Sequence, residues 1–167
     1  MADNSRRETD QHALWCFSLE FYAVSGVAQA LIRLQDRDGL DVNLIIFALW
    51  LGLSGHRPLD KDTLAAADRA VRTVRAEVVE PLRTLRRRLK GNPDTCVQNL
   101  RKGVKELELA AEKLVQLRLA RLAGPRDAKA PHDARLAAAY ANLALYLGPE
   151  RLDVAEAAVI RKAIEAN

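Results

Sequence analysis

The sequence predicts an all-α protein: a bundle of about seven helices that includes a long antiparallel helical hairpin. Three observations support this prediction. Alanine, leucine and arginine, which are good helix formers, dominate the 167-residue chain. Apolar side chains recur at steps of three and four residues, as expected for helices that bury one face. Long runs of β-branched residues, which are typical of strands, are missing.

The size and composition of the chain favour one folded domain. Apolar residues make up 49% of the sequence and charged residues 29%, which excludes a disordered chain. A chain of this length can bury a core without disulfides or a structural metal. We therefore expect a flexible tail over residues 1–9 and a single all-α domain over residues 10–167.

Residues 10–55 are expected to form three apolar helices. The first begins near Asp10 and ends at Ser25-Gly26, and the second ends at the turn signal Asp38-Gly39. Asp41 is placed to cap the third helix. That helix is apolar nearly all round, so it is predicted to lie at the centre of the domain.

Residues 60–122 are expected to form the long hairpin. Its first helix is capped by Asp60 or Asp62 and runs to about residue 90. The residues expected on its buried face are Leu64, Ala67, Val71, Val74, Val78, Leu82, Leu85 and Leu89. The spacing of this stripe changes phase next to Pro81, which lacks a backbone donor, so we expect a kink there.

The second helix of the hairpin is expected over residues 95–122, after the turn sequence GNPD. The residues expected on its buried face are Val97, Leu100, Val104, Leu107, Ala111 and Leu114. Because the turn is short, the two long helices must fold back on each other, as in an antiparallel coiled coil. A linker at 124–133 and two short closing helices within 134–165 complete the prediction.

A group of polar residues lies beside the most apolar helix: Asp36, Asp38, Asp41 and Asn43. They could form a carboxylate site that, with Glu20, holds Mg²⁺ or uses Asp41 as a base. The spacing excludes an EF-hand loop. The interpretation that we favour is that the aspartates end one helix and cap the next, while the Asn43 amide satisfies nearby polar groups.

Six of the eight aromatic residues lie in the first fifty positions. They could line a ligand pocket, or they could simply be part of the core, which is the interpretation that the sequence favours. If a pocket exists, the residues expected to line it are Trp15, Tyr22, Gln35, Asp36, Asp41, Asn43 and Trp50.

The sequence gives no support for catalysis. The three histidines share no local motif with serine, cysteine or aspartate, and no phosphate-binding or nucleophile motif occurs. Cys16 and Cys96 are far apart and imply neither a metal site nor a disulfide, so we expect reduced thiols in a cytoplasmic protein. No cofactor is predicted.

The strongest asymmetry in the sequence is its charge. Eleven basic and three acidic residues between positions 69 and 105 give this segment a net charge of +8, against +4 for the whole chain. The residues expected to contact a partner are Arg83, Arg86, Arg87, Arg88, Lys90, Arg101, Lys102 and Lys105. They could meet nucleic acid, an acidic protein or anionic lipid, or they could form a solvated face. No aromatic residue interleaves them, which argues against sequence-specific RNA binding.

Several N-terminal motifs resemble those of one family. They are W-x-F-S-L-x-F-Y at 15–22, G-V-A at 26–28, L-Q-D at 34–36, G-L-D-V-N at 39–43 and L-W at 49–50. In these motifs the chain is similar to small proteobacterial helical proteins grouped as a conserved hypothetical family with a domain of unknown function. The resemblance implies a bacterial cytoplasmic protein and brings no activity, cofactor or catalytic residue.

From these observations we expect a non-enzymatic cytoplasmic interaction or adaptor protein, whose basic hairpin engages an acidic protein or nucleic acid. The alternative is a protein that binds a small molecule or a divalent metal at the N-terminal aspartates and aromatics. The longest apolar run, 44–53, is about half the roughly twenty residues of a membrane span, so none is expected. The apolar stripes of the long helices are also compatible with a homodimer.

Overall fold

A computed structural model describes the backbone of residues 2–166 and the side chains of residues 9, 10 and 12–166. Over this range the fold is all-α, as predicted, and its only extended pairing is an isolated bridge between His56 and Arg126. The elements are α1 (Ala2–Ala23), α2 (Val27–Asp38), α3 (Val42–Leu53), α4 (Lys61–Val74), the π-helical segment η1 (Arg75–Val79), α5 (Glu80–Arg88), α6 (Thr95–Ala120), α7 (His132–Leu147), the 3₁₀ segment η2 (Pro149–Arg151) and α8 (Ala155–Glu165).

Helix α3 lies at the centre of the fold, as its apolar sequence predicted. Every residue of α3 from Val42 to Gly52 is buried. Its most extensive neighbour is α7, which runs alongside it. The two helices approach closely at Gly52, where an added Cβ would lie 2.2 Å from the backbone nitrogen of Ala139. Only glycine fits this crossing without moving one of the two helices.

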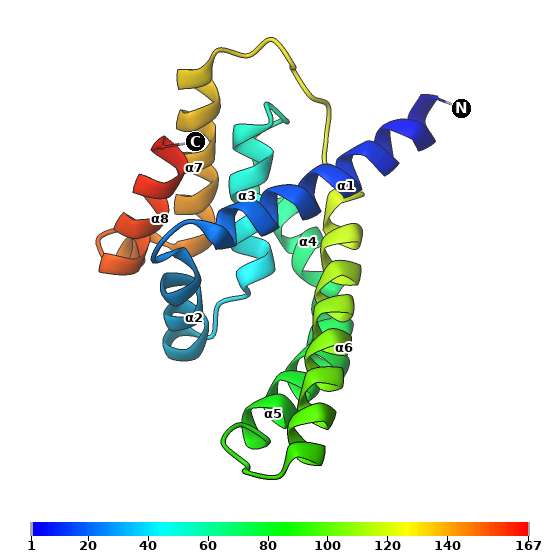
Figure 1. The fold of residues 1–167 in the computed structure, drawn as a ribbon. Helices are drawn as coiled ribbons and strands as arrows, with labels where there is room; N and C mark the ends of the chain where they lie inside the picture. Colours follow the sequence, from blue (N-terminus) through cyan, green and yellow to red (C-terminus); the bar gives the residue numbers. More distant parts are fainter. Residues whose placement is uncertain (1, 167) are drawn as a thin grey trace.

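The other helices surround this centre, and the hairpin extends beyond it (Figure 1). Helix α1 crosses the body and packs on the C-terminal half of α6, while α2 packs on α8. The pair formed by α5 and the N-terminal half of α6 projects away from α3 and α7. Within the described residues, no single helix is long and apolar enough to cross a membrane, and α1 and α2 meet that criterion only as a pair bent by 100°.

Helix α1 begins earlier than expected. It starts at Ala2, whereas the sequence predicted a flexible tail over residues 1–9 and a helix start near Asp10. No glycine or proline precedes Gly26, so the backbone chemistry does not stop the helix at Asp10. The Asp10 carboxylate instead lies buried, 3.8 Å from His56 Nε2. The predicted tail covers residues 1–9, of which the side chains of residues 1–8 lie outside the described residues, so its flexibility stays a prediction.

The irregularity expected beside Pro81 is present as the π-helical segment η1. The amide of Glu80 bonds the carbonyl of Arg75, five residues earlier, and Pro81 has no amide to donate. The wide turn changes which residue enters the core. Val79 is buried, whereas Val78, which the sequence placed on the buried face, is 41% exposed.

The predicted buried face of α6 is half wrong. Leu100, Leu107 and Leu114 are 59%, 60% and 42% exposed. The buried residues of this helix are Val104, Glu108, Ala111, Val115, Gln116, Leu119 and Ala120. The sequence pattern assigned the leucines to the core because they are apolar, but the side of α6 that faces α5 carries a glutamate that pairs with arginines.

Candidate functional site

Arg83 joins the hairpin to the N-terminal helices. It lies on α5, and its Nη1 donates to Oε1 of Gln35 on α2 over 2.6 Å. Its Nη2 donates to Oε1 of Glu112 over 2.6 Å, and its Nε donates to Oε1 of Glu108 over 3.2 Å. One guanidinium thereby bridges α2, α5 and α6.

Two more of the predicted partner-binding arginines are paired within the chain. Arg86 donates to both carboxylate oxygens of Glu108. Arg87 donates to both carboxylate oxygens of Asp36 on α2, over 2.9 and 3.1 Å. These carboxylates lie 22 and 51 residues away in the sequence, so a local count of charge could not reveal them. Arg83, Arg86 and Arg87 therefore brace the hairpin, and a partner would meet them already hydrogen-bonded.

The remaining predicted contact residues lie further along the hairpin. Arg88, Lys90, Lys102 and Lys105 are exposed, and no described residue forms an ion pair with them. Arg101 is half-buried, and its Nε is buried without a hydrogen-bond partner among the described residues. The free positive charge of the hairpin is thus smaller than the sequence suggested and lies near the hairpin end and at Lys105.

A groove runs between α1 and α2 on one side and the hairpin on the other, with a volume of about 370 Å³. The residues that line it are Leu19, Tyr22, Ile32, Gln35, Val42, Arg83, Arg86, Arg87, Lys105, Glu108, Leu109 and Glu112. Four of the nine exposed large apolar side chains of the described residues lie here: Leu19, Tyr22, Ile32 and Leu109. Four cationic and two anionic side chains give the lining a net charge of +2. The groove therefore combines an apolar wall with a basic one.

The surroundings of the groove shift the pKa values of three of its lining residues. Burial opposes ionisation of Glu108, but hydrogen bonds from Arg86 and Arg83 outweigh it and lower the pKa of this carboxyl. Burial also raises the pKa of Glu112, which Arg83 only partly offsets. The Tyr22 side chain is 37% exposed, but desolvation of its hydroxyl and the nearby Glu112 carboxylate raise its pKa, so the hydroxyl stays protonated.

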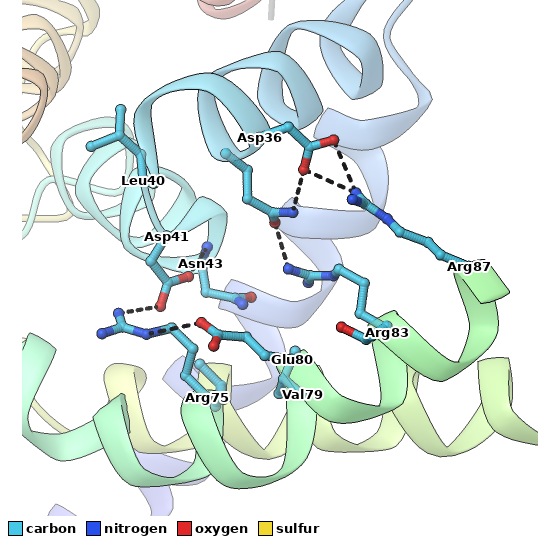
Figure 2. A pocket seen from close by; sticks show the side chains of 13 residues that line it. Asp36, Leu40, Asp41, Asn43, Arg75, Val79, Glu80, Arg83 and Arg87 are labelled. Carbon is cyan, nitrogen blue, oxygen red and sulfur yellow. Dashed lines mark hydrogen bonds and ion pairs between the residues drawn. The ribbon is translucent and has the colours of Figure 1, made fainter.

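A second cavity, of about 430 Å³, shares Gln35, Arg83 and Arg87 with the groove, and Figure 2 shows the residues that line it. We call it the polar pocket, and its lining residues are Gln35, Asp36, Gly39, Leu40, Asp41, Asn43, Arg75, Val79, Glu80, Arg83, Thr84, Arg87 and Val115. Its carboxylates are matched by its guanidinium groups. Arg75, for example, donates to Asp41 over 2.9 Å and lies 3.9 Å from Glu80.

The helix-end interpretation of the aspartates is confirmed at Asp41. Its carboxylate accepts a hydrogen bond from the backbone N–H of Asn43 over 2.8 Å, which caps α3, and its own backbone N–H donates to the Tyr146 hydroxyl. Gly39 adopts the left-handed conformation that ends α2. Asn43 is buried, and its Oδ1 accepts a hydrogen bond from Gln116, which also donates to Ser18.

The three aspartates do not converge on a metal. Asp36 pairs with Arg87, Asp41 with Arg75, and Asp38 with its neighbour Arg37. Among the described residues, no group of three histidine, cysteine or acidic side chains is arranged to hold a metal ion. The divalent-metal hypothesis therefore finds no ligand set here.

The seven residues predicted to line one ligand pocket are divided between several places. Gln35, Asp36, Asp41 and Asn43 line the polar pocket, and Tyr22 lines the groove together with Gln35. The two tryptophans belong to neither cavity. Trp50 is buried against Phe47 and His56, and Trp15 lies beneath the ammonium of Lys113, 5.5 Å from its ring centre.

Sequence reasoning missed six residues of the groove: Leu19, Ile32, Val42, Leu109, Glu108 and Glu112. The apolar residues look like core positions, because their spacing within each helix is compatible with burial. Val42 is indeed buried, but the angle between α1, α2 and the hairpin leaves Leu19, Ile32 and Leu109 exposed. A signal for the two glutamates was present in the arginines of α5, because a buried guanidinium requires an acceptor.

Comparison with known protein families identifies a match over most of the chain. A model of the family described as "Protein of unknown function (DUF2390)" matches residues 13–119. The matched range contains every residue that lines the groove and the polar pocket. No curated protein and no solved structure matches the chain.

Proposed function

The chain belongs to this family of proteins of unknown function, and on that premise we propose that it is a non-enzymatic interaction protein. Its groove binds an acidic, amphipathic segment of another protein. The observation that carries the proposal is the pairing of exposed Leu19, Ile32 and Leu109 with the cations of the hairpin in one cavity. Amphipathic helices commonly bind in this way, with their apolar face in a groove.

The chemistry of the groove favours a protein over a nucleic acid. Leu19, Ile32 and Leu109 give the groove an exposed apolar wall, which the apolar face of a peptide can cover and a sugar-phosphate backbone cannot. Tyr22 is the only aromatic side chain in the lining, so consecutive bases would have no stacking platform. Apolar anchors in a desolvated centre with charges at the rim are typical of protein interfaces.

The free cations extend the binding surface along the hairpin. Lys105 lines the groove, and Arg88, Lys90 and Lys102 continue the positive charge toward the hairpin end. Such exposed charges mainly accelerate association and select acidic partners, while the buried apolar contacts slow dissociation. Binding should therefore weaken with salt but persist in part through the apolar wall.

The test uses the full chain with a photo-crosslinking amino acid at position 19, which also lines the groove, incubated in native lysate and analysed by mass spectrometry. The proposal expects a defined cross-linked protein whose contact peptide is acidic and has an apolar face. Ile32→Glu should abolish its capture, and Lys105→Ala should weaken it. Val78→Glu is the matched control, because Val78 is similarly exposed but does not line the groove. Capture that nuclease removes, or that Ile32→Glu leaves unchanged, would refute the proposal.

A second candidate function is small-molecule binding in the polar pocket, and one observation favours it. Asn43 lines this cavity and uses its Oδ1 to accept a hydrogen bond from Gln116, whereas its Nδ2 donates to no described residue. The amide donor is therefore available to an oxygen acceptor of a ligand in this cavity. A thermal-shift screen of small carboxylates and amides tests it. Stabilisation should disappear in Asn43→Ser, and the absence of any stabilising compound would count against this candidate.

A further inference from the structure

Helix α6 carries a second apolar line, distinct from the groove. Leu100, Leu107 and Leu114 are exposed and lie seven residues apart, so they share one face of the helix. The positions three residues further on are Gly103, Ala110 and Leu117. This is the a/d spacing of a helix pair, and we call these six residues the leucine face. None of the six lines the groove or the polar pocket.

The leucine face fits a second copy of itself when the two helices run in opposite directions, because two leucines of one copy then lie opposite small residues of the other. In an antiparallel pair, Leu107 of one copy lies opposite Ala110 of the other, and Leu114 lies opposite Gly103. In a parallel pair, glycine would face glycine and alanine would face alanine, which leaves voids between the helices. Space for a partner's leucine exists at Gly103, because nothing lies within 4 Å of the Cβ that could be added there.

The charges beside the leucine face fit the same antiparallel register. Glu106 and Lys113 lie along its edge, and neither forms an ion pair with a described residue. In this register, Glu106 of one copy is offset by about two residues, or roughly 3 Å along the axis, from Lys113 of the other. Two-fold symmetry produces this pair twice. Lys113 rests on the Trp15 ring, which holds its ammonium beside α6.

We infer that the leucine face binds a second copy of this chain in an antiparallel helix pair centred between Leu107 and Ala110. The contact spans residues 100–117, about 27 Å of helix. This is a short interface, so the dimer forms at micromolar rather than nanomolar concentrations. Leu109, which lines the groove, projects from the opposite side of α6, so a dimer would leave both grooves open.

The first test measures the mass of the full chain by sedimentation over a range of concentrations. A concentration-dependent dimer is expected, and Leu107→Glu should raise its dissociation constant at least a hundredfold while the chain stays folded, because Leu107 is exposed. Leu109→Glu is the matched control: it should leave the dimer intact while blocking the groove. Loss of groove binding therefore cannot be confused with loss of the dimer. A monomer at all concentrations, or a dimer insensitive to Leu107→Glu, would overturn the inference.

The second test determines the direction of the helix pair and its charge pairing. In a background with both cysteines replaced by serine, a mixture of Leu107→Cys and Ala110→Cys chains should form mixed disulfides faster than either variant alone. Rapid disulfide formation by Leu107→Cys alone would indicate a parallel pair and refute the register. Glu106→Lys should weaken the dimer roughly tenfold, and adding Lys113→Glu should restore it. No recovery in the double variant would remove the proposed charge pairing.

Discussion

Replacing Arg83 by methionine is the most direct test of whether the hairpin arginines are structural. The substitution preserves most of the side-chain volume and removes all three hydrogen bonds of the guanidinium. It leaves two carboxylates, Glu108 and Glu112, with fewer partners. The side chains of Arg83, Glu108 and Glu112 are 18%, 7% and 25% exposed, so the network is neither fully buried nor solvated.

The loss of folding stability expected for Arg83→Met lies between two limits. Breaking a buried ion pair costs about 3–5 kcal/mol, whereas an exposed pair contributes about 0–1 kcal/mol. For this half-buried network we expect Arg83→Met to lower the free energy of unfolding by about 2–3 kcal/mol. In a chain of this size, that corresponds to a decrease of roughly 4–12 °C in the melting midpoint.

Urea unfolding followed by circular dichroism measures this cost. Arg88→Met is the matched control, because Arg88 is exposed and no described residue pairs with it. Its unfolding midpoint should match that of the unmodified chain. If Arg83→Met unfolds at the same urea concentration as Arg88→Met, the bridges contribute nothing to stability. Arg83 would then be as free to bind a partner as the charge pattern alone implied.

Three further predictions concern the core and the pH dependence. Gly52→Ala should destabilise the chain by about 1–3 kcal/mol or more in urea unfolding, because its Cβ would meet the Ala139 backbone. Gly103→Ala is the control: it lies in open space, so it should stabilise the chain at low protein concentration. Asn43→Leu should cost about 1–3 kcal/mol by removing an acceptor from Gln116, and an unchanged midpoint would contradict the buried network. The pKa of Glu108 is lowered in the folded chain, so the free energy of unfolding should fall as the pH drops below the ordinary glutamate pKa of about 4.3. Glu108→Gln should make this decrease less steep. If the free energy of unfolding falls equally steeply with pH in both chains, Glu108 is not its source.

The parts of the fold that depend on local chemistry could be predicted from the sequence. The apolar segment after Asp41 had to be the central helix, because no other position could cover its whole circumference. The Asp41 cap and the Gly39 turn follow from side-chain and backbone preferences that act within a few residues. The effect of Pro81 on the backbone is also local, so the change in apolar spacing beside it could indicate the irregular turn of η1.

The parts that depend on contacts distant in sequence could not be predicted. Arg87 looks free until α2 is placed beside α5, because its partner Asp36 is 51 residues away. Leu107 looks buried because an apolar spacing does not reveal that Glu108 occupies the inner side of the helix. The groove also depends on how distant segments pack together. Its apolar wall and its basic wall belong to different segments, and the apolar spacing within one segment does not show where another segment packs.

The wide turn of η1 determines the direction in which the hairpin presents its side chains. Each residue of an α-helix rotates the chain by about 100°, so one extra residue in this turn rotates all of α5 by about that angle relative to α4. With one residue fewer, the amino acids of α5 would be unchanged, but Arg83 and Arg87 would point away from Gln35 and Asp36. The brace to α2 and the groove would both be lost. A one-residue deletion between α4 and Pro81 would therefore be more damaging than most substitutions in the groove itself.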